Sequence, residues 1–206
     1  MEPWLPILYP PHNLTLTRED ETKQVWSQIE KESARNSIII FTDGSSIPGQ
    51  GVGMAALILN TTRNKTKFIG TTESVSNFEA ELMGIQLAMD LIEEETTTNT
   101  NITSAAIFSD NQGALIKSTN PYYLSSRQHI YVQTFNKLRK LKEKMEISLY
   151  WCPGHKDIEG NCKVDELAKE ATSNNNINNQ DIIPTILFKL QQLATTITHI
   201  LIPLTE

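Results

Sequence analysis

Short apolar runs separated by turn residues dominate the middle of the chain. Residues 37–42 (S-I-I-I-F-T) and 104–109 (S-A-A-I-F-S) have the pattern of strands buried on both faces of a sheet. Residues 54–59, 67–72 and 147–151 are also predicted to be strands. The first three strands follow one another through short connections, so we expect them to pair antiparallel.

Helical patterns alternate with these strands. A long helix is predicted to begin near Ser76 or Asn77, which are both good N-caps, and to run through residue 95. Further helices are predicted for residues 112–118, 131–145 and 162–172. This order of elements indicates the α/β class, with a mixed sheet that carries helices on its faces.

Changes in composition divide the chain into three parts. Residues 1–35 form a Pro-rich N-terminal arm, in which residues 17–33 fit a short helix docked by Val25, Trp26 and Ile29. Residues 36–173 form the main domain. Residues 174–206 contain an Asn-rich linker and an amphipathic C-terminal helix. The apolar face of that helix consists of Ile186, Leu190, Leu193, Ile197 and Ile200.

Charge and composition restrict the possible functions. The 206 residues include 24 acidic and 18 basic side chains, a net charge of −6. This balance argues against binding nucleic acid by bulk charge, so an anionic partner would be held through bound cations. We find no signal peptide and no apolar run long enough to cross a bilayer, so we expect an intracellular protein, cytoplasmic or nuclear, that is neither secreted nor bound to a membrane.

Candidate catalytic carboxylates follow two of the predicted strands. Asp43 and Asp110 each come directly after an apolar strand and open a polar cluster. Either residue alone would usually be just a turn or cap residue. Two strand ends that each carry an aspartate and a polar cluster favour a binding site, because ligands bind where the strands of an α/β sheet end.

The long predicted helix offers two further carboxylates, Glu79 and Glu81. Glu81 shares its row with Ile85 and Ala88 on the packed side, where a carboxylate must be paired or bind a metal. Glu79 lies in a more polar row, so we expect it to be solvated.

A fourth candidate, Asp165, is predicted in the first turns of the last helix of the main domain, where the helix dipole alone could explain it. If all four carboxylates converge, they repel one another unless cations lie between them. Oxygen ligands select Mg²⁺ or Mn²⁺, and two such ions about 4 Å apart could activate water against a phosphodiester. The residues therefore indicate a metal-dependent phosphodiesterase that acts on nucleic acid.

Four blocks of the sequence combine these carboxylates with polar and glycine residues. The blocks are F-T-D-G-S-S (41–46), E-A-E-L-M-G-I (79–85), F-S-D-N-Q-G-A (108–114) and W-C-P-G-H-K-D-I-E-G-N-C-K-V-D-E-L-A-K-E-A (151–171). In their order and spacing they resemble type 1 ribonuclease H, and the likeness is closest to the ribonuclease H domain of non-LTR retrotransposon reverse transcriptase polyproteins. The resemblance implies a ribonuclease H-like fold, with three antiparallel strands and then two parallel strands in a five-stranded sheet. It also implies endonucleolytic cleavage of the RNA strand of RNA–DNA hybrids, which leaves 5′-phosphate and 3′-hydroxyl ends.

The resemblance also assigns roles to individual residues. It implies that four carboxylates hold two Mg²⁺ ions, for which Mn²⁺ can substitute, and that His155 is a mobile histidine that assists proton transfer or product release. Those four carboxylates are Asp43, Glu81, Asp110 and Asp165. The implied contacts with the minor groove of the hybrid are Gly44, Ser45, Asn77 and Gln112, with looser matches at Ser46 and Asn161.

A basic stretch bears on how the substrate would be held. It consists of Lys137, Arg139, Lys140, Lys142 and Lys144. Glu143 and Glu146 are interleaved with it, which favours a solvated helix face over a binding surface. We therefore expect weak intrinsic affinity for the hybrid, and dependence on a reverse transcriptase in cis or in trans.

Two alternatives belong to other classes. The first is a catalytically idle nucleic-acid-binding or connecting module with the same fold. An idle module would have no need for the four carboxylates and His155, and all five are present. The second is a zinc site formed by Cys152, His155 and Cys162, but a structural zinc site wants four ligands in paired spacing.

Overall fold

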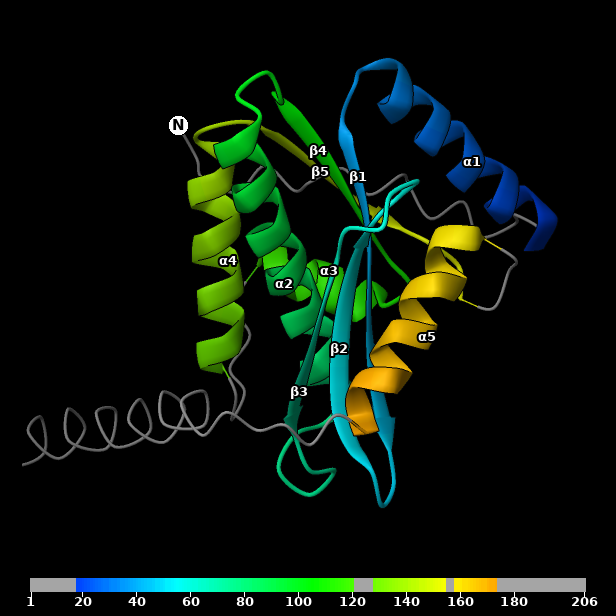
Figure 1. Ribbon diagram of the computed structural model, residues 1–206, viewed down its shortest axis with the longest axis vertical. Coiled ribbons are helices and arrows are strands. Elements are labelled where there is room, and N and C mark those ends of the chain that lie inside the picture. Colours follow the sequence, from blue (N-terminus) through cyan, green and yellow to red (C-terminus); the bar gives the residue numbers. More distant parts are fainter. Residues whose placement is uncertain (1–17, 121–127, 155–157, 174–206) are drawn as a thin grey trace, which may run out of the picture. The chain divides into compact units, whose positions relative to one another are not determined.

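The computed structural model describes residues 18–120, 128–154 and 158–173 (Figure 1). Its centre is a five-stranded sheet in the order β3-β2-β1-β4-β5. β1 to β3 pair antiparallel, whereas β4 pairs parallel with β1 and β5 pairs parallel with β4. This arrangement confirms the predicted mixed sheet. The strands are β1 (Ile38–Ile47), β2 (Gly51–Ile58), β3 (Asn64–Gly70), β4 (Ser104–Ser109) and β5 (Glu146–Trp151).

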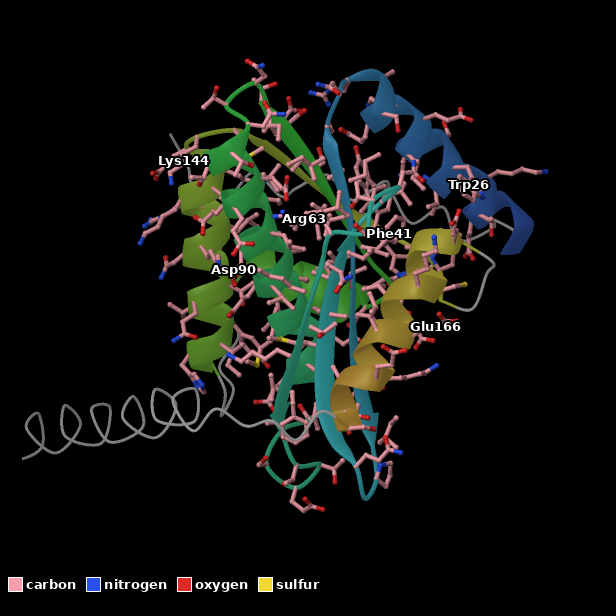
Figure 2. The ribbon with its side chains drawn as sticks, viewed as in Figure 1. Trp26, Phe41, Arg63, Asp90, Lys144 and Glu166 are labelled. Atoms are coloured by element: carbon pink, nitrogen blue, oxygen red, sulfur yellow. The ribbon has the colours of Figure 1, made fainter. Side chains whose placement is uncertain are left out.

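Helices cover both faces of the sheet, as predicted. Figure 1 shows α2 (Asn77–Thr98), α3 (Gln112–Thr119) and α4 (Gln128–Lys142) on one side, and α1 (Arg18–Ala34) and α5 (Glu159–Ser173) on the other. Each side has its own apolar core, because neighbouring strand residues point to opposite faces. Ile40 packs on the α2 side. Phe41, labelled in Figure 2, packs on the α5 side and stacks on Phe108 with ring centroids 5.0 Å apart.

Two element bounds differ from the prediction in ways that affect the site. β1 does not end before Asp43 but continues to Ile47, because it pairs with β2 as far as the Ile47–Gly51 pair. α5 begins at Glu159, three residues before the predicted start, so Asp165 lies in the second turn. The helix dipole acts mainly within the first turn, so it explains Asp165 less well than we expected.

Helix α1 is held by apolar contacts and by a buried carboxylate. Val25 and Ile29 are 2% and 6% exposed and belong to the core on the α5 side. Trp26 is 40% exposed, so the prediction that it docks the helix is wrong. The reason is geometric, because Trp26 points away from the row that Val25 and Ile29 share. Glu32 is buried, and its carboxylate accepts hydrogen bonds from Tyr150 and Ser37 at 2.6 and 2.7 Å.

Several predicted features lie outside the described residues. These are the Pro-rich stretch of the arm, all of residues 174–206 with the amphipathic helix, and the position of His155. The division of the chain into three parts therefore stays a prediction. None of the helices in the described ranges has the length and apolar character needed to cross a membrane.

Candidate metal centre

The register of β1 and β4 brings Asp43 and Asp110 together. The parallel pairing of these strands ends at the Thr42–Ser109 pair, and the two aspartates are the next residues on their chains. β1 still pairs with β2 at Asp43, whereas the chain leaves β4 and enters α3. The site therefore opens where the parallel pairing stops.

Helix α2 starts at a complete capping box. Ser76 is the N-cap, and its Oγ accepts a hydrogen bond from the Glu79 amide at 3.3 Å. The Glu79 carboxylate in turn accepts one from the Ser76 amide at 2.8 Å. Glu79 is 3% exposed, so the expectation that it is solvated is wrong. Its carboxylate caps the start of α2, and Glu81 is the residue that reaches the sheet.

Glu81 reaches the sheet because Gly44 lets helix α2 approach closely. A Cβ atom at position 44 would lie 2.4 Å from the Glu81 backbone nitrogen and 2.5 Å from the Ala80 carbonyl carbon. The Gly44 amide donates a hydrogen bond to Glu81 Oε2 at 3.1 Å. A glycine directly after Asp43 therefore brings the Glu81 carboxylate to the first aspartate.

Asp43, Glu81 and Asp110 form a compact acidic cluster. Each offers a carboxylate oxygen, and these oxygens lie within 4.8 Å of one another. Asp43 is 6% exposed and Glu81 is 5% exposed. Burial, followed by the nearby carboxylates, raises the pKa of Asp43 to about 7 and that of Glu81 to about 9. Within the described part of the chain, no ion pair joins Asp43 or Glu81 to a lysine or an arginine.

Asp165 approaches this acidic cluster from α5. It raises the pKa of Asp43 both as a like charge and through a hydrogen bond, so the two side chains are neighbours. Its own Oδ2 accepts a hydrogen bond from Lys169 Nζ at 2.6 Å, one helical turn further on. The fourth predicted carboxylate therefore lies beside Asp43, although it is not part of the acidic cluster itself, and an ammonium group of the same helix is bound to it.

The donor set of the acidic cluster fits a divalent metal ion. All three groups are carboxylates, which are the ligands that Mg²⁺ and Mn²⁺ prefer. The raised pKa values of Asp43 and Glu81 indicate that the described residues do not compensate the charge of these two carboxylates. A bound cation would supply that compensation. No other group of three acidic, histidine or cysteine side chains in the described ranges could hold a metal ion.

The predicted substrate-contact residues occupy three different elements. Gly44 and Ser45 are buried in β1, and Ser46 beside them is half-buried. Asn77 is the exposed first residue of α2, and its Nδ2 lies 3.5 Å from Glu81 Oε1. The remaining two are Gln112, half-buried at the start of α3, and Asn161, buried in α5. The Asn161 Oδ1 atom has no hydrogen-bond partner among the described residues.

Sequence reasoning missed two residues around the acidic cluster. Asn111 is the N-cap of α3, where its Oδ1 accepts from the Ala114 amide at 3.0 Å, and its hydrogen bond to Glu81 lowers the pKa of that carboxyl. The second residue is Trp151, at the end of β5. Its indole Nε1–H donates to the Asp110 carbonyl at 3.0 Å. The asparagine before a helix was a readable signal, but the indole contact depends on the pairing of distant strands.

The two cysteines are free thiols. Cys152 is buried and Cys162 is exposed. Burial raises the pKa of the Cys152 thiol to about 12. A thiol binds zinc as the thiolate, so this environment disfavours the zinc alternative.

Comparison with known proteins identifies the family. A sequence model of RNase H matches residues 35–173, which is more than half of the chain. The chain belongs to the RNase H family. It is 29% identical to a ribonuclease H of Chlorobium limicola over 146 residues, which are 68% of this chain and 99% of that protein.

A viral relative of this RNase H family member is much longer. The Pol polyprotein of equine infectious anemia virus (strain Wyoming) is 28% identical over 166 residues, 81% of this chain. The chain spans only 12% of that polyprotein.

Solved structures support the RNase H fold. LC11-RNase H1, isolated from compost, matches with a TM-score of 0.54 and 19% identity, over 66% of this chain and 96% of that one. The same protein in complex with an RNA/DNA hybrid matches with a TM-score of 0.50 and 20% identity, with the same coverage. At this level of identity, the likeness concerns the fold.

Proposed function

We propose that this chain hydrolyses the RNA strand of RNA–DNA hybrids endonucleolytically and leaves 5′-phosphate and 3′-hydroxyl ends. Family membership and the fold support this substrate class. The observation that carries the proposal is the acidic cluster, in which Asp43 and Glu81 are buried with raised pKa values and without a lysine or arginine partner among the described residues.

Asp43, Glu81, Asp110 and Asp165 are the residues that would hold the metal, proposed here as two Mg²⁺ ions with Mn²⁺ as a substitute. Bound there, the ions would lower the pKa of a water molecule and neutralise the leaving oxygen. The chain itself orients the carboxylates: the Gly44 amide holds Glu81, and the Trp151 indole holds the backbone of Asp110. His155, outside the described residues, is proposed to move a proton or to assist product release.

Substrate contacts are proposed for residues near the acidic cluster. Asn77 and Gln112 begin the two helices that flank it, so they are suited to contact the minor groove, where the 2′-hydroxyl distinguishes RNA from DNA. The other proposed contacts are Gly44, Ser45, Ser46 and Asn161.

A reverse transcriptase is proposed as a partner, in cis or in trans. The Pol polyprotein relative supports this context, and the closer relationship to non-LTR retrotransposons stays a prediction. Weak intrinsic affinity for the hybrid is part of this proposal, because Glu143 and Glu146 are interleaved with the basic stretch around α4. Lys137 pairs with Asp90 of α2, while Arg139, Lys140, Lys142 and Lys144 are exposed to solvent.

The idle-module alternative is disfavoured by the cost of the acidic cluster. Two buried, mutually repelling carboxylates destabilise a fold unless a ligand compensates them. A module without catalysis would gain stability by losing one of them.

The direct test is a cleavage assay that compares RNA–DNA hybrid, duplex RNA and duplex DNA, each with and without Mg²⁺. We expect cleavage of the RNA strand of the hybrid alone, and only with Mg²⁺. Cleavage that persists in excess chelator would contradict the metal assignment. Mg²⁺-dependent binding of the hybrid without any cleavage would favour the idle module.

A further inference from the structure

The segment from Trp151 to Gly154, at the end of β5, lies next to both the backbone and the carboxylate of Asp110. Trp151 is the last residue of β5, and its Nε1–H donates to the Asp110 carbonyl oxygen at 3.0 Å. The next residue, Cys152, donates its amide to the Ser109 carbonyl at 2.9 Å. The chain around Asp110 is therefore tied to the end of β5 by two hydrogen bonds.

Gly154 lies next to the carboxylate of Asp110. A Cβ atom at position 154 would lie 2.9 Å from Asp110 Oδ2 and 3.7 Å from its Cγ. That is tighter than an ordinary van der Waals contact, so a side chain at this position would press on the oxygen or displace the loop. Glycine at this position leaves both the Oδ2 atom and the loop in their present places.

These contacts matter because Asp110 has the least support from its own elements. Asp43 lies inside β1 and pairs with Ala55 of β2, and Glu81 lies in the second turn of α2. Asp110 lies between β4 and α3, in neither element. Its position relative to the other two carboxylates therefore depends on what holds this short connection.

We propose that Trp151 and Gly154 are positioning residues that fix Asp110 for metal binding. Trp151 holds its backbone from one side, and Gly154 leaves room for its carboxylate on the other. This inference rests on the proposed function, because it assigns Asp110 to a metal ion. Neither the indole of Trp151 nor a glycine offers a side-chain ligand for the ion, so each is proposed to act through Asp110.

The test is Mn²⁺ binding without substrate, measured from the paramagnetic resonance signal of the free ion. The variants are Trp151→Phe, which removes the N–H donor but keeps an aromatic ring, and Gly154→Ala. Residues that orient a metal ligand typically change metal affinity by about 10-fold to 100-fold, so we expect at least about 10-fold weaker binding in both variants. In cleavage assays, the Mg²⁺ concentration for half-maximal rate should rise, while the KM for the hybrid at saturating Mg²⁺ stays unchanged.

The matched control is Tyr150→Phe. It also removes one hydrogen-bond donor from β5, but Tyr150 points to the opposite face, where its hydroxyl donates to Glu32 at 2.6 Å. Its Mn²⁺ affinity should equal that of the unmodified protein, although its stability falls. Equal Mn²⁺ affinities for Trp151→Phe and Tyr150→Phe, or unchanged affinity in Gly154→Ala, would overturn the inference.

A further variant separates this inference from the proposed function. If the unmodified protein binds Mn²⁺ and Asp110→Asn loses it, the proposed metal centre stands, and the affinities of Trp151→Phe and Gly154→Ala decide the inference alone. If the unmodified protein binds no Mn²⁺, the proposed function and the inference both fail. Should Trp151→Phe not fold, Gly154→Ala decides by the same measurement.

Discussion

Two buried carboxylate sites in this fold have opposite surroundings. Glu32 is 1% exposed, yet it accepts hydrogen bonds from the hydroxyls of Tyr150 and Ser37 and lies 3.7 Å from the guanidinium of Arg35. Asp43 and Glu81 are nearly as buried, but each faces another carboxylate, and their pKa values are raised. Burial of an acid is therefore not a sign of function. The sign is a buried acid whose charge the chain leaves uncompensated.

The largest expected difference is between Asp43→Asn and Glu32→Gln. Asp43→Asn removes a metal ligand, so hybrid cleavage should fall by about 10³-fold or more. It also removes a like charge, so the metal-free protein should become more stable at pH 8. Glu32→Gln should keep its cleavage rate but lose about 1–3 kcal/mol of unfolding free energy, because the NH₂ group that replaces one carboxylate oxygen cannot accept the hydrogen bond that a hydroxyl now donates to that oxygen. Cleavage rates and urea unfolding measure the two effects, and a stable, inactive Glu32→Gln would contradict the comparison.

Metal ions should stabilise the fold through the acidic cluster. At a Mg²⁺ concentration 100 times the dissociation constant, binding to one site in the folded state adds about 2.7 kcal/mol. The melting temperature should therefore rise by several degrees in the unmodified protein and in Glu32→Gln. In Asp43→Asn the rise should be largely lost. Calorimetric melting with and without Mg²⁺ measures this, and an equal rise in all three proteins would place the binding elsewhere.

The stability of the metal-free protein should fall as the pH rises. The pKa values of Asp43 and Glu81 increase on folding from their ordinary 3.8 and 4.5 to about 7 and about 9. The folded state therefore binds protons more tightly than the unfolded chain, and its stability falls as the pH rises from about 4 to about 9. Asp43→Asn should flatten this dependence. Urea unfolding across the pH range, in chelator, tests the sign, and a rise in stability over this window that Asp43→Asn abolishes would contradict it.

The smallest expected effect concerns two lysines of α5. Lys169 and Lys163 each donate to a carboxylate one turn earlier at 2.6 Å, but Lys169 binds Asp165 beside the acidic cluster, whereas Lys163 binds the exposed Glu159. Lys169→Met should tighten Mg²⁺ binding by about 2-fold to 5-fold at low salt, because exposed ion pairs are worth about 0.2–1 kcal/mol. Lys163→Met is the matched control. Equal affinities for the two variants would show that Lys169 does not compete with the metal.

Much of the fold could be predicted from the sequence because its signals are local. The short apolar runs predicted β1 and β4, and the alternation of turns and helical patterns predicted the mixed sheet. The continuation of β1 beyond Asp43 could not be read, because Gly44 to Ile47 resemble a turn and only the pairing with β2 makes them a strand. The start of α5 at Glu159 was missed because Gly160 looks like a helix breaker. The glycine is explained by packing between distant elements, since a side chain there would collide with the ring of Phe41.

The candidate site was predictable in its residues but less so in its contacts. Spacing alone separated Glu81 from Glu79, and the structure brings Glu81 to Asp43 and Asp110. The same spacing gave the wrong surroundings for Glu79, because the capping box with Ser76 draws its carboxylate back to the helix end. The support of Asp110 by Trp151 joins residues 41 positions apart, so no local pattern could indicate it.

We expect the acidic cluster to bind divalent ions because the described residues leave the charges of Asp43 and Glu81 uncompensated. Calorimetric titration with Mg²⁺ at pH 8 measures this binding in the unmodified protein, Asp43→Asn and Glu32→Gln. The unmodified protein and Glu32→Gln should bind Mg²⁺, and Asp43→Asn should not. Undiminished binding by Asp43→Asn, or none by the unmodified protein, would contradict this expectation.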